Sequence, residues 1–134
     1  MLSDIFSQPQ KAEIENKSYF FEYNHASLAM LEKRTNKSPY EIYDCIIEKN
    51  KIMLNDSIAL TICAMQKNHN TQDILDMENL LRENPGVWYD IKEAVVLSFI
   101  APMTPPSIVN AINTNENSKK KIQKHKSSKQ NMIG

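Results

Sequence analysis

The chain has 134 residues, 41% of them hydrophobic, which suffices for one small domain with tails. Its zero formal net charge hides two opposite parts. Residues 1–117 carry 10 basic and 16 acidic side chains, a net charge of −6, whereas residues 118–134 carry six lysines and no acid. With only two glycines the chain excludes a glycine-rich phosphate loop, and an acidic body with a basic tail is typical of a protein that holds partners.

The chain begins with a polar stretch, residues 1–17, that includes Pro9 and predicts a flexible N-terminal lead-in. The aromatic-rich segment that follows, residues 18–23, is expected to be a short strand or an extended segment packed on the body. From there the apolar spacing becomes helical. We therefore predict an all-α domain over residues 18–101, a compact bundle of about five short helices.

The first two expected helices have recognisable N-termini. Asn24 is a candidate N-cap for a helix that runs to about Arg34. The next helix begins at Ser38-Pro39-Tyr40-Glu41, which supplies a capping hydroxyl, a proline at the first helical position and a glutamate three residues after the cap. This second helix is expected to end near Asn50 and to bury one stripe, formed by Ile42, Tyr43, Ile46 and Ile47.

Three further helices follow. The third is expected over residues 56–67 and is ended by Asn68-His69-Asn70, after which Thr71 can cap the fourth. Asn84-Pro85-Gly86 ends that helix, and the fifth runs over residues 87–101. The expected inward residues of these helices are Ile58, Ile62 and Met65, then Ile74, Met77, Leu80 and Leu81, then Trp88, Ile91, Val95 and Phe99.

The second half of the fifth helix, Ala94–Ala101, is apolar almost all round. Such a helix is either central to the core or covered by another subunit, and the sequence leaves both open. About eight apolar residues are far fewer than the roughly 20 that span a bilayer, and the first ten residues lack the pattern of a secretory signal. We therefore expect no membrane contact and a cytoplasmic location.

Residues 102–134 are expected to be a proline-containing extension followed by a disordered lysine-rich tail. The tail offers electrostatic contacts to nucleic acid, or to an acidic partner through weak, screened attraction. It has no aromatic residue and no arginine, so it offers neither base stacking nor bidentate phosphate recognition. Its candidate contact residues are Lys119, Lys120, Lys121, Lys124, Lys126 and Lys129.

Residues with catalytic or metal-binding chemistry are sparse. The three histidines are far apart, and Cys45 and Cys63 form no CxxC pair, so we expect reduced thiols, no metal site, no cofactor and no catalytic residue. Residues 28–47 imitate a helix-turn-helix, but Glu41 and Asp44 stand where DNA phosphates would lie. Two packed helices of a bundle are the preferred interpretation there.

The order of features from Phe21 to Ala101 resembles the small helical tail assembly chaperones of long-tailed bacteriophages and related prophages. The features that carry the resemblance are the lead-in Phe21-Glu22-Tyr23, the helix Leu28–Glu32 ending at Thr35, the turn Lys37-Ser38-Pro39, the helix start Asp56-Ser57-Ile58, and the Asn84-Pro85 break before Glu93-Ala94.

The resemblance implies a non-enzymatic protein of the host cytoplasm that binds the phage tape-measure protein, keeps it soluble and passes it to tail-tube subunits. It also implies absence from the finished virion and a longer form made by a −1 frameshift, for which the codons of Lys119–Lys121 are a candidate site. Self-association is a further expectation. Because apolar helix surface beyond the needs of a core marks interaction, the candidate partner contacts are the exposed members of Trp88, Tyr89, Val96, Phe99 and Ile100. The alternative is a small nucleic-acid-binding regulator that uses the lysine tail.

Overall fold

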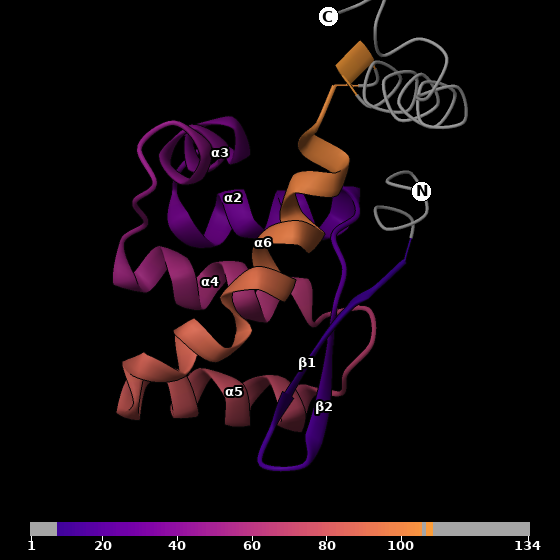
Figure 1. Cartoon of the computed structure of the whole chain (residues 1–134), viewed down its shortest axis with the longest axis vertical. Helices are drawn as coiled ribbons and strands as arrows, with labels where there is room; N and C mark the ends of the chain where they lie inside the picture. Colours follow the sequence, from indigo (N-terminus) through magenta and orange to yellow (C-terminus); the bar gives the residue numbers. More distant parts are fainter. Residues whose placement is uncertain (1–7, 106, 109–134) are drawn as a thin grey trace, which may run out of the picture. The chain divides into compact units, whose positions relative to one another are not determined.

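The computed structural model describes residues 8–105 and 107–108. One compact unit, residues 6–103, contains the elements discussed below, and the described residues after Met103 belong to a second unit, in which the Ile108 N–H donates to the Pro105 carbonyl. The unit is mostly helical, as predicted, with five α-helices among the described residues (Figure 1). The elements are β1 (Gln10–Ile14), β2 (Lys17–Phe21), α2 (His25–Thr35), α3 (Pro39–Ile47), α4 (Leu54–Ala64), α5 (Thr71–Glu83), the 3₁₀ turn η1 (Pro85–Val87) and α6 (Trp88–Met103).

An N-terminal β-hairpin corrects the prediction of an all-α domain. β1 pairs antiparallel with β2 in a register that runs from Gln10 opposite Phe21 to Ile14 opposite Lys17. The two turn residues, Glu15 and Asn16, both have positive φ, 49° and 66°, as a two-residue type I′ turn requires. The lead-in over residues 1–17 was expected to be flexible, but its described part, from residue 8 on, consists mainly of β1 and the hairpin turn. The extended segment expected over residues 18–23 is largely β2.

The predicted N-caps of the first two helices are confirmed. Asn24 accepts a hydrogen bond from the Ser27 N–H at 2.9 Å, and Ser38 accepts one from the Tyr40 N–H at 3.1 Å, with Pro39 at the first position of α3. The predicted cap of α5 is wrong by one residue. Asn70 caps it by accepting from the Asp73 N–H at 2.8 Å, and Thr71 is the first helical residue. Asn is the stronger capping residue of the two.

Helix α4 lies at the centre of the unit, where it packs against α2, α5, α6 and β2 (Figure 1). Eight consecutive residues, from Ser57 to Ala64, are buried, so the helix is covered all round. It begins and ends earlier than the predicted 56–67. At its C-terminal end the Ala64 carbonyl accepts a hydrogen bond from the Glu22 N–H at 2.9 Å, which joins the chain after β2 to the end of the helix.

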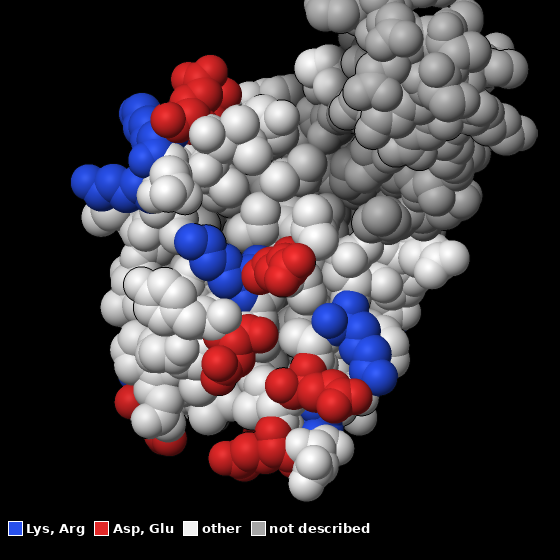
Figure 2. Space-filling view, in the orientation of Figure 1, with Lys and Arg blue, Asp and Glu red and all other residues white. Residues whose placement is uncertain are grey.

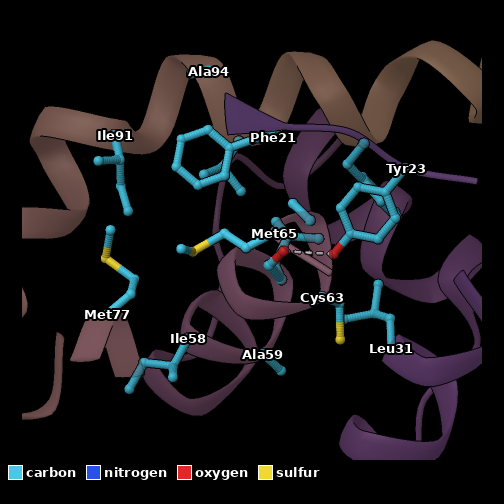
Figure 3. Packing of buried hydrophobic residues seen from close by; sticks show 14 of the residues in the cluster. Phe21, Tyr23, Leu31, Ile58, Ala59, Cys63, Met65, Met77, Ile91 and Ala94 are labelled. Carbon is cyan, nitrogen blue, oxygen red and sulfur yellow. Dashed lines mark hydrogen bonds between the residues drawn. The ribbon is translucent and has the colours of Figure 1, made fainter. Parts of the chain in front are cut away.

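The core brings together aromatic residues of the N-terminal segment and apolar residues of α4 and α6 (Figure 3). Phe21 is fully buried, and the buried Tyr23 hydroxyl donates to the Leu60 carbonyl at 2.5 Å. The Tyr23 ring meets the Phe99 ring edge-on, with centroids 5.4 Å apart. Pro102, which was expected to end the regular structure, lies inside the last turn of α6. Near a helix end the missing proline N–H removes a single backbone bond, so the helix continues to Met103.

Candidate functional site

The five predicted contact residues of α6 have different positions in the structure. Tyr89 is 77% exposed, Val96 and Ile100 are half-buried, Trp88 is 8% exposed, and Phe99 is fully buried. Phe99 is therefore a core residue. The six tail lysines lie outside the described residues, so the structure does not bear on them.

Trp88, Tyr89 and Val96 come together in a surface hollow of about 410 Å³, which we call the α6 groove. One wall is η1 with the first half of α6, and the other is the end of α3, the connection over residues 48–53 and the start of α4. Trp88, Lys92 and Val96 are spaced four residues apart, which places them on one face of α6. The remaining lining residues are Ile46, Asn50, Lys51, Ile52, Leu54, Ser57, Pro85 and Gly86.

The apolar lining continues beyond the α6 groove into an adjoining hollow of about 200 Å³, which shares Lys51 and Ile52 with it. The two hollows together include three large apolar side chains that are more than half exposed: Met53 at 58%, Leu54 at 55% and Tyr89 at 77%. A contiguous exposed apolar surface of this kind marks an interaction site more often than isolated exposed residues do. The sequence indicated the α6 wall; the residues from 46 to 57 were missed, because only tertiary packing brings them beside α6.

The charged residues of the α6 groove are all basic. Lys51 and Lys92 line it, and no acidic residue does. Lys49 lines the adjoining hollow, whose one acid, Asp56, is held by Lys37 with an Nζ–Oδ2 distance of 2.5 Å. Figure 2 shows basic side chains at the upper left of the view with acidic atoms beside them, further basic side chains near the centre and on the right, and mainly acidic side chains lower down.

Most other basic residues of the described part have an acidic partner. Lys17 binds Asp73 at 3.0 Å, Arg34 binds Glu78 at 2.8 Å, and Lys67 binds Glu22 at 2.5 Å. Lys49, Lys51 and Lys92 have no such ion pair within the described residues. The groove thus combines an apolar lining with lysines that form no ion pair within the described residues.

His69, expected only as part of a helix break, holds the hairpin to the helices. Its Nε2 accepts the Phe20 N–H at 2.9 Å, and its Nδ1 lies 3.1 Å from the Asp73 carboxylate. The Nε2 lone pair is therefore occupied, and the ring proton on Nδ1 donates to Asp73. These hydrogen bonds from His69 and from Lys17 lower the pKa of Asp73 below its ordinary value. The arrangement is structural: the ring packs against Tyr19 and Phe20.

The two cysteines differ in burial: Cys45 is half-buried and Cys63 is buried. The two thiols are unpaired, and burial raises the pKa of Cys63 to about 11, which leaves it protonated at neutral pH. Within residues 8–105 and 107–108, no cluster of three or more His, Cys, Asp or Glu side chains is arranged to hold a metal ion. In the same residues, no helix combines the length and the apolar character that crossing a membrane requires.

Comparison with known proteins adds no further assignment: no family model, curated protein or solved structure matched the chain significantly. We take the α6 groove as the candidate site, because it combines an apolar lining with large exposed side chains.

Proposed function

We propose that the protein is a non-enzymatic tail assembly chaperone of a long-tailed bacteriophage or prophage. It binds the tape-measure protein, keeps that protein soluble, and helps to recruit tail-tube subunits. The resemblance of residues 21–101 to this class suggests the role, and the observation that carries it here is the α6 groove with its exposed apolar lining.

The physical demands of the role agree with these features. A long helical client exposes amphipathic surface that aggregates in water, and a small helical body can cover it by accepting a helix in an apolar groove. Each copy contributes one weak site. Many copies along one client gain through multivalency what each site lacks in affinity.

The experiment is a pull-down of the tagged full-length chain from cells that express its native operon, with intact-mass analysis of the retained proteins. We expect a large helical phage protein, tail-tube protein, and a second form of this chain that diverges near Lys119–Lys121. Co-expression should also move the tape-measure protein from the insoluble to the soluble fraction.

Deletion of residues 118–134 separates the two candidate functions. If the protein is a chaperone, the chain without residues 118–134 should still bind its client, because the apolar groove lies in the body. The nucleic-acid-binding regulator would instead be established by a different result: the chain retains nucleic acid and no helical client, and this retention is lost in high salt and on deletion of residues 118–134.

A further inference from the structure

We propose that the α6 groove is selective for charge: it takes an amphipathic helix whose apolar face is flanked by acidic residues. That the partner is a helix of a client protein rests on the proposed function; the preference for acidic flanks rests on the lysines of the groove.

The shape of the groove suits a helix. Trp88, Lys92 and Val96 span nine positions of α6, which rise about 12 Å, or just over two turns. A partner helix lying beside that stripe presents residues i, i+4 and i+7 to it. Tyr89 on one wall and Leu54 on the other are exposed apolar side chains that such a helix would cover.

The lysines of the groove determine which charged residues can flank the apolar face of the partner helix. Lys92 comes from the α6 wall and Lys51 from the opposite wall, and neither has an ion pair within the described residues. An acidic side chain on each side of the partner's apolar face would meet a lysine, whereas a basic one would be repelled. The body carries a net charge of −6 over residues 1–117, yet both charged residues that line the groove are lysines.

The same argument excludes this chain's own tail as the occupant. Residues 118–134 contain six lysines and no acid, so they would place like charges beside Lys51 and Lys92. Nucleic acid is a poorer fit, because the lining is mainly apolar and Lys51 and Lys92 are its only charged groups for a phosphate backbone.

The test measures the affinity of the full-length chain for two fluorescent helical peptides by anisotropy. Both carry the same leucines at i, i+4 and i+7, one with glutamates and the other with lysines beside them. We expect the glutamate peptide to bind about tenfold more tightly, and the difference to shrink in about 0.5 M salt, because exposed charges are screened there.

Charge variants locate the preference. The double variant Lys51→Glu/Lys92→Glu should weaken binding of the glutamate peptide by about tenfold, because each exposed charge pair changes affinity by a factor of a few. The matched control is Lys33→Glu, an exposed lysine on α2 outside the groove, which should bind as the unchanged protein does. Lys92→Gln, which adds no buried acid, should give an intermediate loss, and circular dichroism verifies that each variant is folded.

Apolar variants locate the groove itself. Tyr89→Ala should weaken both peptides by about fivefold, since an exposed tyrosine at an interface contributes through its large contact area. Tyr40→Ala is the matched control, because Tyr40 is 75% exposed and lines neither hollow.

Equal binding of the two peptides, binding of neither, or equal losses in Lys33→Glu and in the double variant would each overturn the charge preference. Displacement of the glutamate peptide by a DNA duplex would also overturn it. So would a change of oligomeric state in the groove variants, measured by sedimentation, because it would show that a second copy of the chain occupies the groove. The charge preference and the chaperone function can fail separately. If the phage client binds but the two peptides bind equally, the chaperone function stands and the charge preference is wrong. If the peptides are distinguished but no phage client is found, the charge preference stands and the chaperone function is wrong.

Discussion

The two adjacent phenylalanines of β2 provide the strongest test of the hairpin. Phe21 is fully buried, in the core with Tyr23, whereas Phe20 is 38% exposed and packs flat against the His69 ring, with centroids 6.3 Å apart. Successive residues of a strand point to opposite faces. Replacing each by alanine therefore compares a core contact with a surface contact one position away.

The expected magnitudes differ severalfold. Phe21→Ala removes a fully buried ring and leaves a cavity beside α6, which should lower the free energy of unfolding by about 3–5 kcal/mol. Phe20→Ala loses partial burial and one ring contact, a cost of about 1 kcal/mol. For a domain of this size each kcal/mol lowers Tm by roughly 4–8 °C, so Phe21→Ala should lower Tm by at least about 12 °C.

The assay is equilibrium unfolding in urea, followed by tryptophan fluorescence and by circular dichroism on the two variants and the parent. Because Trp88 is the single tryptophan and lies in the core, its emission reports on packing around α6. A larger loss for Phe20→Ala than for Phe21→Ala would show that the strand register is shifted by one residue, which exchanges the two faces. Equal and small losses would refute the docking of the hairpin on the helices.

Three further predictions concern single groups. Asp73→Asn should lower the urea midpoint at neutral pH. Because the folded state lowers the pKa of Asp73, the difference from the parent should begin to shrink as the pH falls through the ordinary carboxyl pKa of 3.8, and it should be lost once the pH passes below the lowered pKa of the folded state; a difference that stays constant in acid would contradict this. Ser38→Ala should cost about 1 kcal/mol of unfolding free energy, and a change near zero would remove the capping bond from α3. At pH 8, Ellman's reagent should label the half-buried Cys45 and leave Cys63 unlabelled until urea unfolds the chain, because burial raises the pKa of Cys63 to about 11; two equally fast thiols would contradict its burial.

The helices could be predicted because their signals are local. Asn24 and the Ser38-Pro39 pair cap helices through bonds to residues two or three positions away, so spacing in the sequence is enough to find them. The all-round burial of α4 agrees with its apolar composition. Its C-terminal end was placed too late. There the Ala64 carbonyl accepts the Glu22 N–H, a contact between residues 42 positions apart that no local pattern contains.

The hairpin could have been found and was missed. Ala12 and Ile14 alternate with charged residues, and Asn16 tolerates the positive φ of a two-residue turn, but the polar composition of residues 1–17 favoured a flexible segment. The candidate site was half predictable. Apolar surface on α6 is visible in the sequence, whereas Lys51 and Leu54 reach it only through the path of the chain after α3.

The apolar character of α6 left two interpretations open, a core helix or a helix covered by another subunit. The packing supports the first for part of the helix, and the second stays a prediction. Ala94, Val95 and Phe99 are buried where α6 meets α4 and the hairpin. The face with Trp88, Lys92 and Val96 forms one wall of the groove, and Lys92 and Val96 are only half-buried there. A lysine on the outer face is ordinary for an amphipathic helix, so Lys92 by itself does not show that a partner binds there. The affinity of the groove for helices of opposite charge is therefore the property to measure.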